Sequence, residues 1–219
     1  MKASCILYHS NIMSIYKERW IKQCIKTIKD QTYQDFDVFE LNYGDDNTKL
    51  SELYDVGGNK HFYEKIKMNN HAEAMNYLID KVFLEEKYDI CFNINLDDYY
   101  DTYRFEKQIE SVNEGYELIS SEYRFISERG DVDIVGGLAG LSMDTMEGLF
   151  NKGITPIAHP CVCYTKDFWV KYGKYNPSEI PMEDKLLWVR SYSKGAKLHI
   201  LKTPLLYYRL HQKQVSNGI

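Results

Sequence analysis

The chain has 219 residues, of which 44% are hydrophobic and 14% aromatic, so it can bury a sizeable core and wholesale disorder is excluded. Its 27 basic and 32 acidic side chains give a net charge of −5, which argues against a broad nucleic-acid surface. No apolar run reaches the ~18 residues of a membrane-spanning helix, and the first ten residues lack the apolar core of a signal peptide. The five cysteines, mostly inside apolar runs, fit buried free thiols in a reducing compartment, so the expected location is the cytoplasm.

The first half of the chain alternates between strand-like and helix-like patterns. Helical spacing of apolar residues predicts amphipathic helices near residues 20–28, 72–82 and 105–112. Short apolar segments that suit strands alternate with these helices. Residues 4–8 precede the first helix, residues 37–41 and 61–63 lie between the first and the second, and residues 90–94 lie between the second and the third. Such alternation is typical of a mostly parallel sheet with helices on both faces.

The second half is less regular. Five glycines between Gly136 and Gly153 predict a mobile, functional loop. The remaining expected elements are a strand at 157–164, helices at 167–172 and 183–193, and two closing strands at 197–200 and 205–210. Neither a linker nor an internal repeat divides the chain, so we expect a single domain over residues 1–219.

The main functional signal is Asn95-Leu-Asp97-Asp98, directly after the apolar segment 90–94. In open α/β sheets, ligands gather at the carboxyl ends of the strands. Adjacent carboxylates there need a cation or a hydrogen-bond network, and Mg²⁺ or Mn²⁺ suits both carboxylate and diphosphate oxygens. The alternative is that Asp97 and Asp98 only cap a helix beginning near Thr102.

Five segments, taken in order, carry a more specific signal. The first is Q-T-Y-Q-D-F-D at 31–37, together with the expected helix that precedes it from residue 14. The others are N-H-A-E-A-M-N at 70–76, D-D-Y-Y-D-T-Y-R-F-E-K-Q at 97–108, E-D-K-L-L-W-V-R at 183–190, and Y-Y-R-L-H at 207–211. Together they resemble the family 2 glycosyltransferases, which are inverting enzymes with a GT-A fold. Two departures are Thr102 in place of the family's usual proline and Ala72 in place of its usual glycine.

The resemblance implies an α/β fold of GT-A type: a single Rossmann-like domain with a mostly parallel central sheet flanked by helices. Residues 1–98 or so would form the nucleotide-binding half, and residues 99–219 or so the acceptor-binding half. The implied reaction moves a sugar from a nucleotide-diphosphate sugar, expected to be a UDP-sugar, to a hydroxyl of a glycan or related acceptor. Mn²⁺ or Mg²⁺ would be the cofactor.

Two other functions remain open. A catalytically silent sugar-nucleotide-binding module is favoured by Asn95 and by the altered Gly-Asp-Asp-Asn at 44–47, where the family carries D-D-G-S. A sugar nucleotidyltransferase would also use acidic residues and Mg²⁺, but it normally needs a glycine-rich phosphate loop, and residues 8–16 contain no glycine.

The resemblance also assigns the donor side of the site. Asp97 and His211 would bind the metal, although the family's D-x-D is Asn95-x-Asp97 here, so the first carboxylate is an amide. The choice between Asp45 and Asp46 is open, and the pair can also be read as a solvated turn. The implied nucleotide-sugar contacts are Tyr8, His9, Ser10, Asp45, Asp46, Asn76, Asn95 and Arg209.

Glu183 and Asp184 match the family position of the catalytic base, which must lie opposite the leaving group for inversion. We expect Asp184 to be the base and Glu183 to contact the acceptor or support the loop. The alternative is an ordinary acidic first turn of a helix, which is favourable against the helix dipole. The residues implied on the acceptor or sugar side are Asp98, Tyr99, His159 and Trp188, whereas His61 and His71 are expected to be structural.

Overall fold

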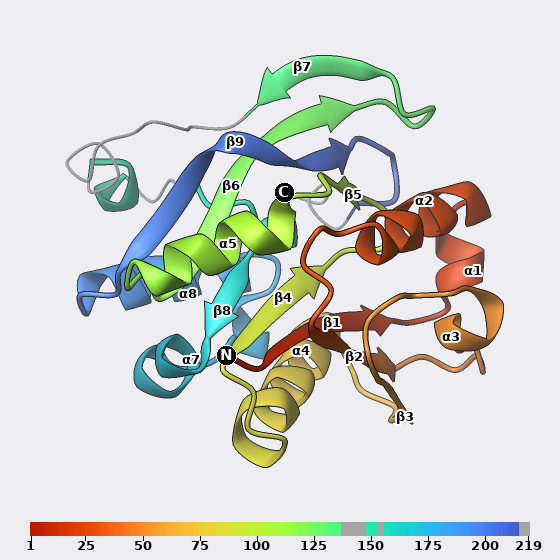
Figure 1. Cartoon of the computed structure of the whole chain (residues 1–219), viewed down its shortest axis with the longest axis horizontal. Coiled ribbons are helices and arrows are strands. Elements are labelled where there is room, and N and C mark those ends of the chain that lie inside the picture. The colour runs from red at the N-terminus through yellow and green to blue at the C-terminus, as the bar shows by residue number, and fades with distance from the viewer. Residues whose placement is uncertain (137–147, 153–155, 215–219) are drawn as a thin grey trace.

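One twisted sheet runs through the molecule, with helices packed against both of its faces (Figure 1). The computed structural model of the protein describes residues 1–136, 148–152 and 156–214. Nine strands in this part of the chain form the sheet, in the order β3-β2-β1-β4-β8-β6-β9-β5, with β7 paired to β6. The expected α/β sheet flanked by helices is confirmed.

The first half of the chain builds the parallel part of the sheet. β1 (Ala3–His9) lies between β2 (Phe36–Asn42) and β4 (Ile90–Ile94), and β3 (His61–Lys65) continues the sheet beyond β2, all in parallel. Leu7 pairs with Ile94, so the next residues of β1 and β4 meet at the same carboxyl edge.

The second half adds strands in both directions. β8 (Cys163–Thr165) is antiparallel to β4 and to β6 (Leu118–Ile126), while β6 and β9 (Leu198–Arg209) run parallel. β5 (Tyr99–Tyr100) and β7 (Val132–Gly136) join as antiparallel neighbours of β9 and β6. The sheet therefore extends past β4 over the second half of the chain.

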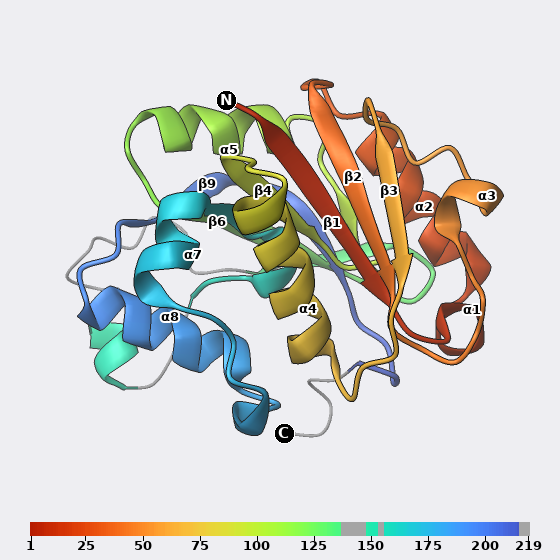
Figure 2. The ribbon, with the colours of Figure 1, turned by 90° about the horizontal axis from the view of Figure 1, so that it is seen from below.

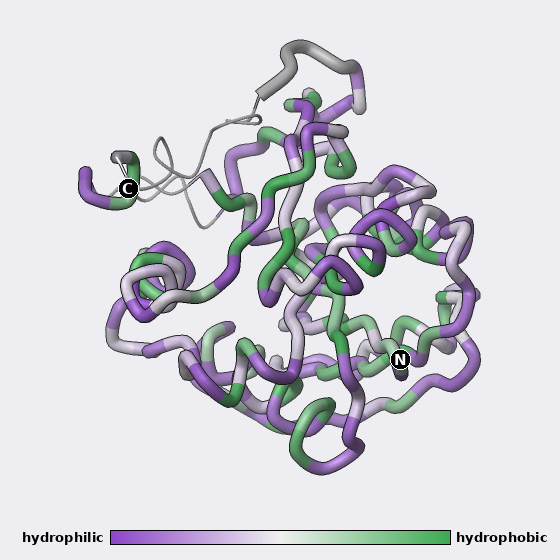
Figure 3. Tube along the Cα trace, turned by 60° about the vertical axis from the view of Figure 1, so that its left-hand side comes forward, coloured by the Kyte–Doolittle hydropathy of each residue, from purple (hydrophilic) through white to green (hydrophobic). Residues whose placement is uncertain are grey.

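The helices pack in two groups. α2 (Glu18–Lys29) and α5 (Arg104–Asn113) contribute to one apolar core, and α4 (His71–Asp80), α7 (Lys166–Tyr172) and α8 (Glu183–Ser193) contribute to the other. Figure 2 shows the second group together, and Figure 3 shows hydrophobic residues along the central strands. The short elements are α1 (Ile12–Ile15), α3 (Leu50–Leu53), a π-helical turn at Lys81–Glu85, and 3₁₀ turns at His159–Cys161 and Pro177–Glu179.

Two expectations for the second half are wrong. In the expected strand at 157–164, residues 159–161 form the 3₁₀ turn and the strand begins only at Cys163, because Gln108 Nε2 donates to the carbonyl of Cys161 (2.6 Å) and Pro160 has no N–H for a ladder. The two expected closing strands are one continuous strand, β9. The predicted glycine-rich loop lies largely outside the described residues.

All five cysteines are buried and free, in agreement with their expected structural role. Within the described ranges, none of the helices has the length and apolar character that crossing a bilayer requires.

Candidate active site

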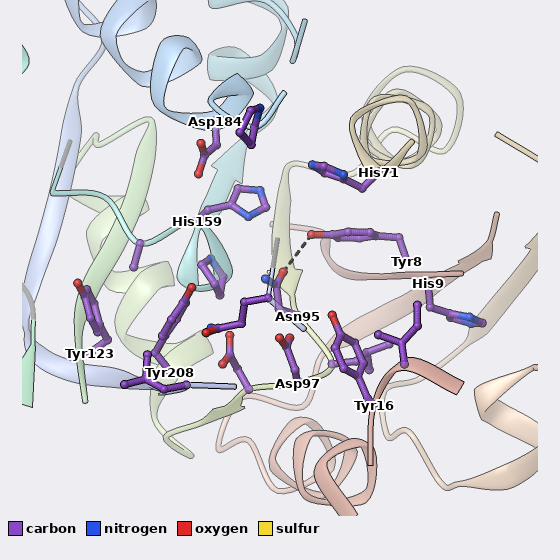
Figure 4. A pocket seen from close by; sticks show the side chains of 18 of the residues that line it. Tyr8, His9, Tyr16, His71, Asn95, Asp97, Tyr123, His159, Asp184 and Tyr208 are labelled. Carbon is purple, nitrogen blue, oxygen red and sulfur yellow. Dashed lines mark hydrogen bonds between the residues drawn. The ribbon is translucent and has the colours of Figure 1, made fainter. Parts of the chain in front are cut away.

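A pocket of about 600 Å³ lies at the carboxyl edge of the parallel strands (Figure 4). Its walls come from the ends of β1 and β4, from α1, from the first turn of α8, from residues 156–160, and from β6 and β9. Folding thus brings together segments from the whole length of the chain. The predicted site residues that line the pocket are Tyr8, His9, Ser10, Asn95, Asp97, Asp98, His159, Glu183 and Asp184.

Asn95 follows β4 and is fixed by its neighbours. The Tyr8 hydroxyl donates to Asn95 Oδ1 (2.9 Å), as Figure 4 shows, and Asn93 Nδ2 donates to the same oxygen (3.3 Å). The backbone N–H of Asn95 donates to the Tyr100 hydroxyl (2.8 Å). The amide oxygen of Asn95 therefore already accepts two hydrogen bonds.

The Asp97 carboxylate is hydrogen-bonded to His211, which lies outside the pocket lining. Asp97 Oδ2 lies 2.9 Å from His211 Nε2, and His211 Nδ1 accepts the backbone N–H of Lys213 (3.2 Å). Because Nδ1 is an acceptor, the ring proton is on Nε2 and points at Asp97. Asp97 lines the pocket and His211 does not, so the geometry makes His211 a partner that orients the carboxylate.

Asp98 and Arg209 form the buried base of the same loop. Asp98 Oδ1 accepts the backbone N–H of Arg209 (2.8 Å), and burial together with the adjacent Asp97 raises the pKa of Asp98 well above its ordinary value. The Arg209 side chain donates to the carbonyl of Asp97 (2.8 Å) and to Gln23 Oε1 (2.7 Å). Arg209 is buried and does not line the pocket, so it shapes the loop from within.

The alternative of a simple helix cap does not fit Asp97 and Asp98. β5 lies between these residues and α5, which begins only at Arg104. The carboxylate beside the start of the helix is Asp101, which accepts the backbone N–H of Tyr103 (2.9 Å).

Glu183 and Asp184 stand in the first turn of α8 and have different partners. Glu183 Oε1 lies 2.6 Å from His71 Nε2 at the start of α4. Burial raises the pKa of Glu183, but the hydrogen bond from His71, a backbone hydrogen bond and the charge interactions with His71 and His159 together outweigh it, and the net pKa is below the ordinary value. Asp184 accepts the backbone N–H of Lys185 (2.5 Å), and within the described chain its carboxylate forms no ion pair. Asp184 is therefore the freer carboxylate.

His159 lies between Asp184 and Asn95 in Figure 4. Its Nε2 is 3.1 Å from the Tyr175 hydroxyl. Burial lowers the pKa of His159 below 6.5, against the opposing influence of Asp184 and Glu183. The imidazole is therefore neutral near neutral pH and is a hydrogen-bonding group in the wall.

His9 contacts the pocket but directs its ring elsewhere. His9 Nε2 lies 3.0 Å from Glu40 Oε1 in the buried part of β2. Asp45 is exposed and pairs with Lys67 (2.6 Å), whereas Asp46 accepts hydrogen bonds from Asn42 and Thr48 (both 2.8 Å). The structure therefore places Asp45 and Asp46 in a turn outside the pocket lining.

Three more predicted residues lie outside the pocket lining. Asn76 exchanges two hydrogen bonds with the backbone of Tyr175 (2.9 and 3.1 Å). Tyr99 stacks on Tyr207 with ring centroids 4.4 Å apart, and Trp188 is fully buried in the core. Their direct contact with donor or acceptor stays a prediction from the sequence alone.

Several lining residues were not predicted. His71, expected to be structural, lines the pocket and bonds Glu183. An aromatic set from α1, the end of β2, β6 and β9 completes the walls; these residues are Tyr16, Tyr43, Tyr123, Phe125 and Tyr208. The alternation of Tyr123 and Phe125 in a strand was a signal that both share one face, but the sequence could not show which face meets the pocket.

The charged side chains that line the pocket are mainly acidic. Its described lining has four carboxylates, on Asp97, Asp98, Glu183 and Asp184, and neither a lysine nor an arginine. Within the same part of the chain no three His, Cys, Asp or Glu side chains group to hold a metal ion. A cation here would need Asp97 together with oxygen atoms of a ligand, which is how Mg²⁺ is often bound beside substrate phosphates.

The structure is similar as a whole to solved structures of S. aureus TarS. The TarS chain matches with a TM-score of 0.72 over 96% of this chain at 13% identity. TarS 1–349 in complex with UDP-GlcNAc matches with 0.74 over 100% at 12% identity, and the complex with UDP with 0.72 over 96% at 13%. The fold is a GT-A-like glycosyltransferase fold.

The match covers only part of those proteins. This chain spans 37% of the TarS chain and 61% of TarS 1–349. No protein-family model matches the sequence, and no curated protein matches it.

Proposed function

We propose that this protein is an inverting glycosyltransferase that moves a sugar from a UDP-sugar to an acceptor hydroxyl, with Mn²⁺ or Mg²⁺ as cofactor. The observation that carries the proposal is one pocket, in a GT-A-like fold, that contains both Asp97 after β4 and Asp184 at the start of α8. A UDP-sugar donor is supported by the TarS structures of similar fold, which hold UDP-GlcNAc and UDP.

The donor would lie at the carboxyl ends of β1, β2 and β4, where ligands bind in open α/β sheets. Tyr8, Ser10 and Tyr43 line this end of the pocket. Asn95, fixed by Tyr8, offers its amide to the donor (2.9 Å between the Tyr8 hydroxyl and Asn95 Oδ1). Asp45 and Asp46 have partners of their own outside the lining, so we assign the donor contacts to the residues at the strand ends.

The residues present fit a divalent cation. The diphosphate of the donor is an anion, and the described lining offers carboxylates but neither lysine nor arginine to balance it. Asp97 keeps one carboxylate oxygen for the pocket while His211 holds the other (2.9 Å). A bound cation would neutralise the diphosphate and act as a Lewis acid on the leaving group.

Asp184 is the proposed base. It lines the pocket and is free of ion pairs in the described chain, whereas Glu183 is held by His71 (2.6 Å). Asp184 would take the proton of the acceptor hydroxyl as its oxygen forms a bond to the anomeric carbon of the donor. The bond from that carbon to the diphosphate breaks on the opposite side, and UDP leaves with the electron pair, so the configuration is inverted.

A silent nucleotide-binding module is the second candidate, because Asn95 carries no charge and Asp98 is buried with a raised pKa. Both features reduce the negative charge that this loop offers to a cation. A weakly held cation could then support binding without turnover.

A donor screen tests the proposal. The protein is incubated with UDP-, GDP- and CMP-sugars in Mn²⁺, in Mg²⁺ and in EDTA, and the released nucleotide is measured beside calorimetric titration with UDP. We expect turnover of a UDP-sugar that needs the cation and falls sharply in Asp184→Asn. UDP binding without turnover of any donor would favour the binding module, and absence of UDP binding with either cation would contradict both candidates.

A further inference from the structure

An aromatic patch forms one end of the pocket, and the proposed donor contacts do not use it. We define the patch as Tyr123, Phe125 and Tyr208. Tyr123 and Phe125 alternate along β6 and so share one face, and Phe125 pairs with Tyr208 on β9. All three side chains are half-buried. The Phe125 ring stands edge-on to both tyrosine rings, at 83° to each, and the two tyrosine rings contact each other with centroids 5.9 Å apart and planes tilted by 50°.

The patch is separate from the donor end. In Figure 4, Tyr123 and Tyr208 lie on one side of Asp97, and Tyr8 and Tyr16 lie on the other. The hydroxyl groups of Tyr123 and Tyr208 are on the side of their rings nearer Asp184. A ligand that contacts the patch would therefore lie near Asp184, the proposed base. The carboxyl ends of β1 and β4 would lie on the other side of Asp97.

The chemistry of this end favours a sugar ring. The face of an aromatic ring carries partial negative charge, which attracts the polarised C–H groups on the flat side of a pyranose. The tyrosine hydroxyls can donate and accept hydrogen bonds, and the nearby carboxylates can accept them, as the hydroxyl groups around such a ring require. An apolar wall with a few polar groups is the usual build of a small-molecule site.

Charge restricts the ligand further. The Asp184 carboxylate, which forms no ion pair within the described chain, disfavours an anionic group such as a phosphate, a sulfate or a uronic acid at this end. The described lining also lacks the lysine or arginine side chains that usually bind such groups.

We propose that the aromatic patch binds the acceptor, and that the acceptor is a neutral carbohydrate whose ring stacks on Tyr123 and Tyr208. This assignment rests on the proposed glycosyltransferase function and names its acceptor class and acceptor subsite. The stacked ring presents one hydroxyl to Asp184, which takes its proton, while the oxygen bonds to the donor's anomeric carbon and UDP departs. Phe125 packs edge-on against both tyrosine rings.

A glycan array tests the assignment directly. Labelled protein is applied, with UDP and Mn²⁺, to an array of neutral, phosphorylated, sulfated and uronic-acid glycans, and the best-retained neutral glycan is then titrated in solution. We expect retention by neutral glycans, and an affinity loss of about tenfold or more in Tyr208→Leu and in Tyr123→Leu. Tyr208→Phe, which keeps the ring, should lose much less.

Tyr207→Leu is the matched control, because Tyr207 is the adjacent residue on β9, points to the opposite face, and stacks on Tyr99. It should leave glycan affinity unchanged, and all variants should bind UDP as the parent does. Failure of every neutral glycan to bind, a preference for anionic glycans, or an equal loss in Tyr207→Leu would overturn the assignment. Tyrosine-dependent glycan binding without UDP binding would contradict the proposed function and leave the carbohydrate subsite standing.

Discussion

Asp184 and Glu183 are adjacent in the chain, yet their surroundings fit them for different tasks. Changing Asp184 to Asn should lower sugar transfer by about 10²–10⁴, the usual effect of removing a general base. UDP affinity should not change, because the proposed donor contacts lie at the strand ends. Transfer rates and UDP titrations of the same preparation measure the two effects.

Glu183→Gln is the control for that experiment. It keeps the size of the side chain and weakens the contact with His71 (2.6 Å), so we expect a milder loss of transfer. A dead Glu183→Gln beside a nearly normal Asp184→Asn would mean that the two roles are exchanged.

Asp97 is the residue on which the proposed cation depends. Asp97→Asn should abolish Mn²⁺-dependent UDP binding, because an amide supplies no charge and the described lining has no other free carboxylate after β4. Thermal unfolding should change little, since the amide can still accept the His211 hydrogen bond. Calorimetry that shows unaltered affinity for UDP with Mn²⁺ would refute the assignment.

Asn95→Asp is the complementary change. It places a carboxylate at a position that already accepts the hydrogen bond of the Tyr8 hydroxyl (2.9 Å), so metal-dependent affinity should hold or rise. A large loss would show that the amide group itself is required.

At the residue scale, the sequence was informative where a side chain follows a strand. Asn95, Asp97 and Tyr8 line the pocket as expected because the carboxyl ends of parallel strands meet at one edge. Partners far apart in sequence could not be foreseen. The contact between His71 and Glu183 joins residues 112 positions apart, and only the packing of α4 beside α8 creates it.

At the scale of elements, Glu40 connects three strands and a helix. Its carboxylate on β2 meets His9 Nε2 of β1 (3.0 Å), His61 Nε2 of β3 (2.8 Å) and the backbone N–H of Leu50 at the start of α3 (2.6 Å). Burial raises the pKa of Glu40, but the hydrogen bonds from His61, His9 and Leu50 outweigh it and lower the pKa from 4.5 to about 2.

This shift predicts how stability depends on pH. Because the folded pKa lies below the unfolded value, Glu40 contributes fully above pH 4.5, and the contribution is lost as the pH falls toward about 2. Glu40→Gln should lower the free energy of unfolding by about 3 kcal/mol at neutral pH. Urea titrations of parent and variant should show this gap shrinking in acid, and a gap of constant size at all pH values would contradict the prediction.

The helices and strands of the first half were predictable because apolar residues recur in it with clear helical or strand spacing. β4 has the expected bounds since an apolar run ends at a polar residue, and α2 buries the expected stripe of Trp20, Ile21, Cys24, Ile25 and Ile28. The second half depends on tertiary contacts instead. Arg104 and Gln108 on α5 donate to the carbonyls of Val162 and Cys161, and such contacts decide where β8 begins.

At the scale of the whole molecule, ligand binding should stabilise the chain. The pocket is lined by segments from both halves, so a bound nucleotide links them and shifts the equilibrium toward the folded state. UDP at about 100 times its dissociation constant should add about 2.7 kcal/mol. A rise in melting temperature with UDP and Mn²⁺ that disappears in EDTA is the expected result, and an equal rise in EDTA would argue against a bridging cation.

The contacts of Arg209 have a consequence for recombination between chains of this fold. This one side chain from the end of β9 reaches Gln23 on α2 (2.7 Å) and the carbonyls of Asp97 (2.8 Å) and Glu128 (3.3 Å). A crossover near residue 98 would inherit Arg209 from one parent and the side chain at position 23 from the other. A parent with an apolar or basic residue at position 23 would leave the guanidinium without one of its acceptors and disturb the backbone at Asp97. Positions 23 and 209 should therefore be inherited together in any chimera designed to exchange residues 99–219.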